Sequence, residues 1–229
     1  MPAAKFDGLD DRDTSAEAPS DCSLCPRLSA FLAGQRAREP SWHNAPVPSF
    51  GSPDARFLVV GLAPGLKGAN RTGRPFTGDY AGDLLYGTLL EFGHASGAFE
   101  ARADDSLRLI GTMITNAVRC VPPENKPTPV EIATCRRYLS ARIAALPNLR
   151  VMLALGRIAH ESVLTTLRQR KAAFPFAHGA RHLLTTGDGR KLLLHDSYHC
   201  SRYNTNTGRL TTEMFRDVFR AVKADLSTS

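Results

Sequence analysis

The 229-residue chain is long enough for one large domain or two small ones, and 42% of its residues are hydrophobic, as in ordinary globular proteins. Its formal net charge of +7 and its pI of about 9.4 favour a polyanionic partner, while an aromatic fraction of 7% argues against a surface of stacked aromatic rings. No run of about eighteen apolar residues and no apolar leader is present, so we expect no membrane span and a cytoplasmic location.

After a polar stretch at 1–20, which we expect to be a disordered tail, strands and helices alternate along the chain. Short apolar runs bounded by Gly or Pro predict strands at 57–61, 112–118, 150–156, 182–186 and 190–195. Apolar residues at helical spacing predict helices at 28–38, 80–93, 129–145, 156–169 and 211–226. The third helix has the clearest start, because Thr128, Pro129 and Glu131 form the pattern of a capping box with Pro at the first position. This alternation predicts a parallel α/β sheet in three layers.

The segment that follows the first strand is unusually rich in Gly and Pro. Pro64, Gly65, Gly68, Pro75 and Gly78 belong to a long connection between Gly61 and the helix at 80–93. Gly allows a backbone to approach a ligand closely, and long ordered loops after strands are where α/β proteins place their sites. From composition alone, a functional loop and a mobile surface loop remain equally good interpretations.

Four of the five cysteines are spaced as metal ligands. Cys22 and Cys25 form a C-x2-C pair, and Cys120 and Cys135 follow as C-x14-C. In a reducing compartment this pattern favours metal binding over disulfides. The ligand count suits zinc and a 4Fe–4S cluster equally, and unliganded buried cysteines remain an alternative.

Three motifs in order resemble one enzyme family. GLAPG at 61–65 with GANRTGRPFTGD at 68–79, ITNAVRC at 114–120 and SYHCSRYNTNTGRLT at 197–211 are similar to the motifs of the type-B (family 5) uracil-DNA glycosylases, the iron–sulfur branch of their superfamily. The resemblance covers most of the chain from Asp21 to Phe215. It implies a single domain at 21–229 with an α/β/α fold and a central four-stranded, mostly parallel sheet. It also implies a monomeric DNA-repair enzyme that flips out uracil, with other deaminated bases as further candidate substrates, and hydrolyses the N-glycosidic bond without a covalent intermediate.

The resemblance assigns roles around a base-binding pocket. Ala63 and Gly65 belong to the first motif and border the base, Phe76 corresponds to an aromatic residue that stacks on it, and Asn116 corresponds to the amide that reads its edge. His199 corresponds to the histidine that donates a hydrogen bond to base O2 as negative charge develops.

A departure from many relatives concerns the attacking water. Several uracil glycosylases carry Asp or Glu where this chain has Ala63. We expect Asn70 to position the water in place of that carboxylate. Asp79 is the alternative, and it could equally be a capping residue of the following helix.

The loop at 201–210 carries Arg202, Asn204 and Arg209 and is expected to contact the minor groove of DNA, although an ordinary polar loop has the same composition. The four spaced cysteines match the family's ligands for a structural 4Fe–4S cluster. Cys200, where relatives usually carry Pro, is expected to be a free thiol.

The alternative function is a non-catalytic nucleic-acid-binding module stabilised by zinc or an iron–sulfur cluster. Catalysis requires Phe76, Asn116 and His199 to converge on one pocket, whereas a binding module does not. Lys67, the nearest lysine to the first motif, is a weak candidate for a Schiff base.

Overall fold

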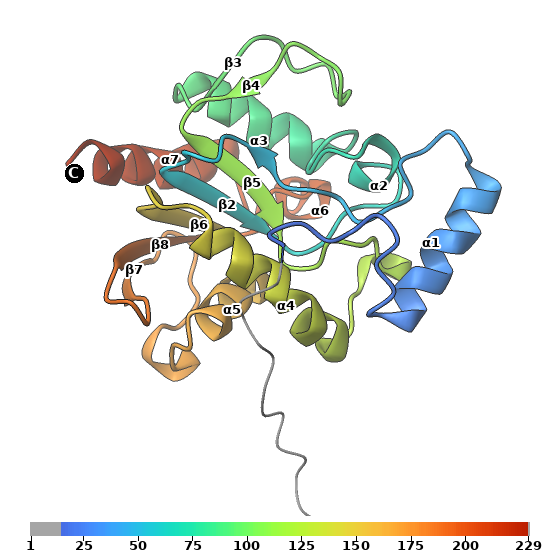
Figure 1. Cartoon of the computed structure of the whole chain (residues 1–229). Helices are drawn as coiled ribbons and strands as arrows, with labels where there is room; N and C mark the ends of the chain where they lie inside the picture. Colours follow the sequence, from blue (N-terminus) through green and yellow to red (C-terminus); the bar gives the residue numbers. More distant parts are fainter. Residues whose placement is uncertain (1–14, 229) are drawn as a thin grey trace, which may run out of the picture.

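The computed structural model describes residues 15–228, and within them a six-stranded sheet forms the centre of the molecule (Figure 1). The strands lie in the order β1 (Phe50–Gly51), β5 (Thr112–Asn116), β2 (Phe57–Gly61), β6 (Val151–Leu155), β8 (Lys191–Ser197) and β7 (Arg181–Thr185). The four inner strands are parallel to one another, whereas β1 and β7 pair antiparallel at the two edges. The expected mostly parallel sheet is confirmed. It has six strands where the resemblance implied four, because the antiparallel edge strands β1 and β7 flank the four parallel ones, and β1, which is two residues long, was not predicted.

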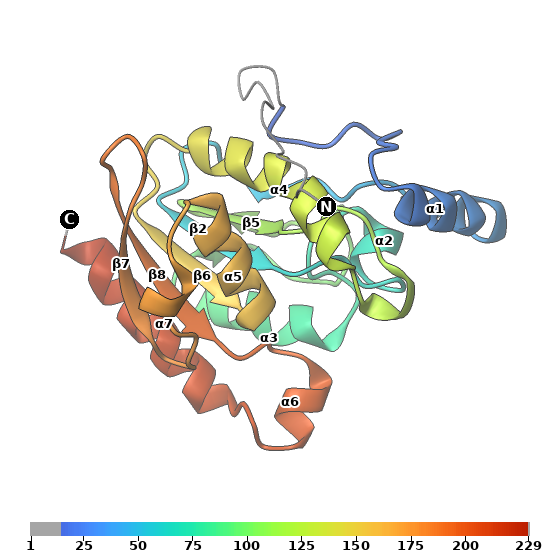
Figure 2. The same ribbon diagram turned by 90° about the horizontal axis from the view of Figure 1, so that it is seen from below.

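Helices cover both faces of the sheet (Figures 1 and 2). The longer ones are α1 (Pro26–Arg38), α3 (Tyr80–Glu91), α4 (Pro129–Ala144), α5 (Arg157–Thr166) and α7 (Thr212–Ser227), close to the predicted ranges. Shorter elements interrupt the connections: α2 (Ala69–Thr72), the hairpin of β3 (Ala95–Ser96) and β4 (Arg108–Leu109), η1 (Pro123–Asn125), η2 (Lys171–Ala173) and α6 (Arg202–Asn206). Among the described residues, no helix combines the length and apolarity that a membrane crossing requires.

The alternation of side chains along β2 builds the two halves of the core. Phe57 and Val59 belong to the apolar cluster that includes residues of α3 and α7, and Leu58 and Val60 belong to the cluster that includes residues of α4 and α5. Every residue of β2, β5 and β6 is buried. Parallel strands covered on both faces read as continuous apolar runs, which is why the sequence identified these three strands.

Helix α4 begins at the predicted capping box. The Thr128 hydroxyl accepts from the Glu131 N–H at 3.3 Å, and the Glu131 carboxylate accepts from the Thr128 N–H at 2.7 Å. The same carboxylate receives a two-point hydrogen bond from Arg27 of α1, at 2.8 and 2.7 Å. One acidic side chain therefore starts α4 and ties it to α1.

The chain connects β2 to β5 on one side and later returns to β6 on the other side of β2. In open α/β sheets, a crevice forms outside the carboxyl ends of the strands where the strand order reverses in this way. Two backbone hydrogen bonds continue the pairing of β2 and β5 beyond the ends of these strands. They run from the Ala117 N–H to Gly61 O and from the Val118 N–H to Leu62 O. This topology places the loops with the sequence motifs at one end of the sheet.

The predicted tail lies partly outside the described residues, which begin at Ser15. Glu17, within the part that is described, pairs with the fully buried Arg119 at 2.9 Å and with Arg142 at 2.5 Å. The segment at 15–20 therefore contacts the folded domain through Glu17, and the expected domain boundary at Asp21 stays a prediction.

A buried ion pair fixes the long loop between β2 and α3. The Arg74 guanidinium donates to both Asp105 oxygens at 2.7 Å and to the Thr77 hydroxyl at 2.9 Å. It lies over the rings of Phe50, Tyr86 and Phe99 at 5.1–5.6 Å. The Asp105 carboxylate, in the connection between β3 and β4, also accepts hydrogen bonds from two backbone N–H groups.

We predict that Arg74→Met lowers the free energy of unfolding by about 3–5 kcal/mol, because it leaves the Asp105 carboxylate buried without its cation. The Arg74 guanidinium holds the pKa of Asp105 well below its usual range, so the ion pair stabilises the protein at neutral and mildly acidic pH and is lost only as the pH falls through that lowered pKa. Urea unfolding at pH 7 measures the loss. Arg102→Met, which removes an exposed ion pair, is the control and should change stability by less than about 1 kcal/mol; equal effects would contradict the prediction.

Candidate active site

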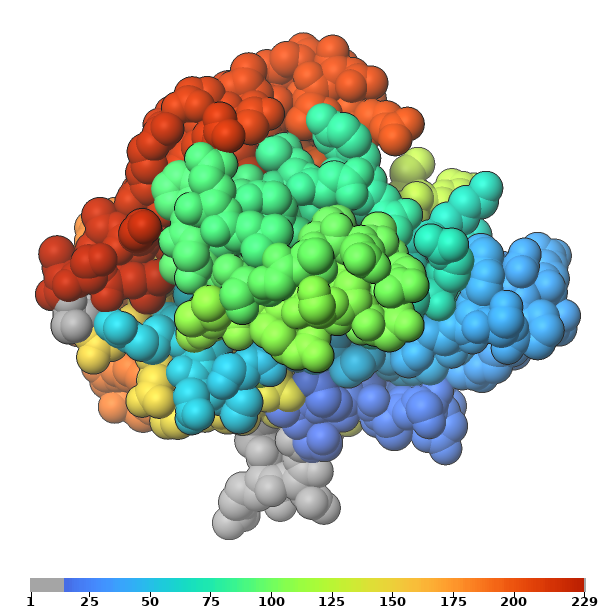
Figure 3. Space-filling view, turned by 90° about the horizontal axis from the view of Figure 1, so that it is seen from above, coloured from blue at the N-terminus to red at the C-terminus, as the bar shows by residue number. Residues whose placement is uncertain are grey.

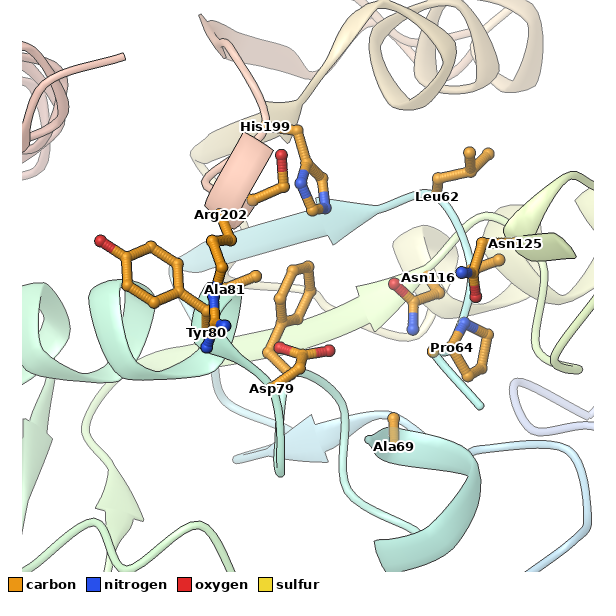
Figure 4. Close-up of a pocket in the computed structure, with 14 residues that line it drawn as sticks. Leu62, Pro64, Ala69, Asp79, Tyr80, Ala81, Asn116, Asn125, His199 and Arg202 are labelled. Atoms are coloured by element: carbon orange, nitrogen blue, oxygen red, sulfur yellow. The ribbon is translucent and has the colours of Figure 1, made fainter. Parts of the chain in front are cut away.

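A cavity of about 570 Å³ opens at the carboxyl end of the sheet. Of the residues predicted from the motifs, it is lined by Ala63, Gly65, Phe76, Asn116, His199 and Arg202. Figure 4 shows Asp79, Asn116 and His199 reaching toward this space from three different segments of the chain. The convergence that catalysis requires is therefore present.

The Phe76 ring lies directly against the end of β2. A Cβ atom on Gly61 would come within 2.6 Å of Phe76 Cζ and within 2.3 Å of Asn116 Oδ1, so only glycine leaves room for both side chains. Phe76 itself has a φ of +53°, in the left-handed region that a bulky residue rarely adopts. Such backbone strain is typical of functional positions, where the surrounding structure holds it in place.

Asn116 is the last residue of β5 and is 3% exposed. Within the part of the chain that the structure describes, its Oδ1 atom has no hydrogen-bond partner. An unpartnered buried acceptor on the wall of a cavity is suited to receive a hydrogen bond from a ligand.

His199 follows β8 on the opposite wall. Its ring centroid lies 6.1 Å from that of Phe76 at an interplanar angle of 31°. Burial lowers the pKa of His199, and the nearby Asp79 carboxylate opposes this only in part. The imidazole is therefore neutral at pH 7. The backbone carbonyl of His199 accepts a hydrogen bond from Asn204 Nδ2 at 2.8 Å, and this bond holds the backbone of the motif in position.

Asn70, which was expected to position the water, lies outside the lining of the cavity. This residue is fully buried in α2, its Nδ2 donates to Asn44 Oδ1 at 2.8 Å, and it does not line the cavity. A single turn of helix places the amide nitrogen against the segment at Asn44, while the Oδ1 atom has no hydrogen-bond partner among the described residues. The sequence did not reveal this turn, because four residues are too few for a periodic pattern.

Asp79, the alternative, does line the cavity. Its Oδ1 accepts from the Gly82 N–H at 3.1 Å and caps α3. The other oxygen, Oδ2, lies over two glycines of the loop: a Cβ would be 3.3 Å away on Gly65 and 2.8 Å away on Gly68. One oxygen of the Asp79 carboxylate thus caps α3, and the other lies beside the cavity.

Asn125 and Tyr80 also line the cavity and were missed by the sequence analysis. Asn125 lies in η1 with a φ of +57°. Asn tolerates this conformation better than most residues, and its place after Pro122, Pro123 and Glu124 was the available signal.

The segment at 201–210, predicted to be a loop, contains the short helix α6. Ser201 caps it by accepting from the Asn204 N–H at 3.4 Å. Arg202 lies over the Tyr80 ring at 5.5 Å, beside the cavity, whereas Arg209 lies over the Tyr198 ring at 4.7 Å, beside a different cavity. The residues expected to contact DNA, namely Arg202, Asn204 and Arg209, therefore do not all line the same cavity.

The four spaced cysteines lie together between α1, α4 and the segment after β5. Cys22, Cys25, Cys120 and Cys135 line one small cavity with Tyr138, whose hydroxyl is 3.6 Å from Cys22 Sγ. Burial is the main reason that the pKa values of Cys120 and Cys135 are raised, the latter to about 11. The Arg119 N–H donates to Cys135 Sγ at 3.3 Å, as an N–H group does toward a ligating sulfur.

The distances among these thiols bear on which group would fit. A tetrahedral zinc site with Zn–S bonds of 2.3 Å requires sulfurs about 3.8 Å apart. Among the described residues, no three of these Sγ atoms lie within 4.8 Å of one another. Cys200 stands apart from them, fully buried, with its Sγ 3.4 Å from Ala81 O.

Comparison with known proteins gives a consistent result. A sequence model described as the uracil DNA glycosylase superfamily matches residues 48–223. The chain is 49% identical over 219 residues to the type-5 uracil-DNA glycosylase of Thermus thermophilus, which covers 93% of this chain and 97% of that protein. Proteins of the same description from Pyrobaculum aerophilum and Mycobacterium bovis are 37% and 40% identical, over 90% and 89% of this chain and 89% and 78% of theirs.

We predict that NMR titration of the His199 ring gives a pKa below the ordinary value of 6.5, and that Asp79→Asn lowers it further. The negative charge of Asp79 stabilises the imidazolium, so its removal favours the neutral ring. His94, whose pKa is lowered by burial to about 4, is the internal control and should not respond. A His199 pKa that rises in the variant would contradict the assigned proximity.

Proposed function

The chain belongs to the uracil-DNA glycosylase superfamily, and from this premise we propose that it excises uracil from DNA by hydrolysing the N-glycosidic bond and leaving an abasic site. The motif resemblance to the type-5 enzymes is confirmed by the extent of the match. The observation that carries the proposal is the convergence of Phe76, Asn116 and His199 on one cavity. A cavity of this size accommodates a nucleobase that has been flipped out of the duplex.

The cavity walls suit the recognition of uracil. The Phe76 ring offers a flat surface for stacking, and it lies against Gly61 at the end of β2. An amide carries both a donor and an acceptor, as the edge of uracil requires, and Asn116 has a buried oxygen without a partner. We assign Phe76 to the base face and Asn116 to the base edge.

His199 stabilises the departing base. Cleavage of the glycosidic bond leaves negative charge on uracil and positive charge on the deoxyribose. A neutral imidazole whose N–H is placed before the reaction stabilises that negative charge as it develops, at no cost of reorganisation. Its lowered pKa makes it a hydrogen-bond donor rather than a source of a full proton.

Asp79 takes the role that the sequence analysis gave to Asn70. Ala63 lines the cavity but has no polar group, and Asn70 is bonded to Asn44 outside it. The Oδ2 atom of Asp79 is the carboxylate oxygen placed to orient a water or to stabilise the sugar cation. Asn70 then acts as a positioning residue that holds the loop after β2.

The binding-module alternative explains less of the structure. A module without catalysis requires neither a strained Phe76 nor a buried, unpaired Asn116 oxygen beside a neutral histidine. Lys67 does not line the cavity. A monofunctional enzyme without a Schiff base agrees with this arrangement.

The cysteine site supports a 4Fe–4S cluster as the cofactor. Four thiolates suit zinc or an iron–sulfur cluster by chemistry, and their separation favours the larger group. When bound, the cluster supplies iron–sulfur bonds that cross-link Cys22 and Cys25 near α1 to Cys120 and Cys135. Reduced thiolate ligands agree with a cytoplasmic location. We assign a structural role and a monomeric state.

The test of the function uses a duplex with one uracil–guanine pair, incubated with excess enzyme and then treated with alkali to cleave abasic sites. The wild type should cleave at the uracil position. His199→Ala should lower the single-turnover rate by about 10²–10³-fold with DNA affinity nearly unchanged, because the interaction strengthens only as charge develops. His199→Gln, which keeps an N–H donor, should recover part of the loss.

Asp79→Asn should also slow the reaction, but less than His199→Ala if the sugar cation forms before water attacks. An inactive Asp79→Asn beside a near-native His199→Ala would reverse this order and refute the mechanism. Absence of cleavage by the wild type would refute the function itself.

For the cofactor, we predict four iron and four sulfide per chain in protein purified without oxygen. Cys135→Ala should lose iron and solubility, whereas Cys200→Ser, which alters the thiol outside the group, should keep the full content. Iron and acid-labile sulfide assays measure this. Zinc in place of iron in the wild type, or full iron in Cys135→Ala, would contradict the assignment.

A further inference from the structure

Three polar side chains meet between α5 and the strands β7 and β8, outside the candidate active site. His160 belongs to α5, His182 to β7 and Asp196 to β8 (Figure 2). His160 Nδ1 lies 2.7 Å from Asp196 Oδ1, and His182 Nε2 lies 3.0 Å from Asp196 Oδ2. One nitrogen of each histidine and one carboxylate oxygen lie within 4.8 Å of one another. None of the three residues lines the cavity of the active site, and the motifs did not single them out.

The Asp196 carboxylate is fully buried without a basic partner. Its ion pairs within the described part of the chain are with the two imidazoles, and no Lys or Arg joins them. The buried Asp105, by contrast, pairs with the guanidinium of Arg74. A buried carboxylate is costly unless a cation compensates it. The surroundings of Asp196 therefore require a positive charge that no Lys or Arg provides.

Both ring nitrogens of His160 face oxygen acceptors. Nδ1 faces the Asp196 carboxylate at 2.7 Å, and Nε2 faces the Phe174 carbonyl at 2.9 Å. A neutral imidazole has one N–H group, so it donates to one of these oxygens and turns a lone pair toward the other. With the N–H group on the Phe174 side, the Nδ1 lone pair and the Asp196 oxygen face each other. A cation bound by both atoms removes this conflict.

The surroundings of the group are those of a metal site. A histidine that binds a metal ordinarily donates its other ring N–H to a carbonyl or carboxylate, and His160 Nε2 is placed to do so toward Phe174 O. The ring of Phe176 lies 5.6 Å from that of His160, and the ring of Phe174 lies 5.8 Å from that of His182. These rings surround the polar atoms with apolar surface, while the His182 side chain is 11% exposed and leaves a route from solvent.

The donor atoms suit zinc. Two imidazole nitrogens and one carboxylate oxygen form a known type of zinc site, with a water molecule in the fourth position. Two atoms bound to one tetrahedral zinc ion at about 2.0–2.1 Å lie about 3.3–3.4 Å apart. The histidine–aspartate separations of 2.7 and 3.0 Å must therefore widen by about half an ångström, which small rotations of the side chains provide.

We propose that His160, His182 and Asp196 bind one Zn²⁺ ion with a water molecule as the fourth ligand. The ion cross-links α5 to β7 and β8, and its role is structural. Asp196 lies three residues before His199, so the ion stabilises the strand that leads to the active-site histidine. The site shares no residue with the four cysteines, and it does not depend on the proposed function.

The experiment uses Zn²⁺ alone as the probe, added to the full-length protein after purification without oxygen and treatment with EDTA. After desalting, mass spectrometry of the metals counts zinc per chain, and X-ray absorption at the zinc edge identifies the ligand atoms. His182→Gln is the main test variant, because Gln keeps an N–H donor for Asp196 but is a poor zinc ligand. Asp196→Asn is the second.

His195→Gln is the matched control. His195 is the neighbour of Asp196 on β8 and points to the other face of the sheet. It also lies against a carboxylate, that of Asp225 at 2.8 Å, but there Arg181 supplies the positive charge. This variant therefore removes a histidine of the same strand from a pair that is already compensated.

The wild type and His195→Gln should each retain about one zinc ion per chain. His182→Gln and Asp196→Asn should each lower zinc affinity by more than about 100-fold, the upper range for residues that only support a metal ligand. Excess zinc should raise the melting temperature of the wild type and the control by about 5 °C or more and leave that of the two variants unchanged. A shift that requires all three ligands separates zinc binding from a general loss of folding.

X-ray absorption should show nitrogen and oxygen ligands at about 2.0 Å and no sulfur at about 2.3 Å. Sulfur ligands would overturn the proposal, because they place the ion among the cysteines. It is also overturned if His182→Gln retains as much zinc as His195→Gln. A wild type that retains no zinc overturns it as well, and a proton shared within the group then compensates the Asp196 charge.

Discussion

The active site depends on a close approach at the end of β2, where Gly61 has no side chain. The Phe76 ring and the Asn116 amide occupy the space that a Cβ atom would take, so both side chains are positioned against the same residue of the strand. Both therefore keep fixed positions relative to the sheet rather than to a mobile loop. A site built against a rigid strand can be organised before the base arrives, which reduces the cost of binding.

The loop that carries Phe76 is held at several points. Arg74 joins it to Asp105 in the connection between β3 and β4, and the Tyr86 hydroxyl donates to Pro75 O at 2.7 Å. Gly82 in α3 lies so close that a Cβ would be 1.9 Å from Phe76 O. Figure 3 shows this side of the molecule, where α3 and the β3–β4 region in green lie beside the C-terminal segment in red and orange. The buried ion pair and the Tyr86 hydrogen bond hold the residues on both sides of the strained Phe76, as the surrounding structure must where such a conformation persists.

The sequence predicted the features that arise from repeated local patterns and missed those that depend on single turns. The apolar runs of β2, β5 and β6 and the capping box at Thr128 identified strands and a helix start because both faces of the sheet are covered and the cap is local. The fold followed from the motifs, and so did the grouping of Phe76, Asn116 and His199 around one cavity and of four cysteines around another. The place of Asn70 outside the cavity lining was not predicted because it depends on the single turn of α2, and α6 was missed because it spans five residues. Asn125 required a left-handed backbone that no periodicity reveals.

His199 is positioned from two sides. Its ring faces Phe76 across the cavity, with the ring centroids 6.1 Å apart. Its backbone carbonyl accepts a hydrogen bond from Asn204 Nδ2, in the α6 segment that Ser201 caps. Burial lowers the pKa of the imidazole, so the ring offers a neutral N–H group to the cavity. A donor that is held in this way requires little reorganisation when negative charge develops on a ligand beside it, which is the condition under which such a group contributes most to a reaction.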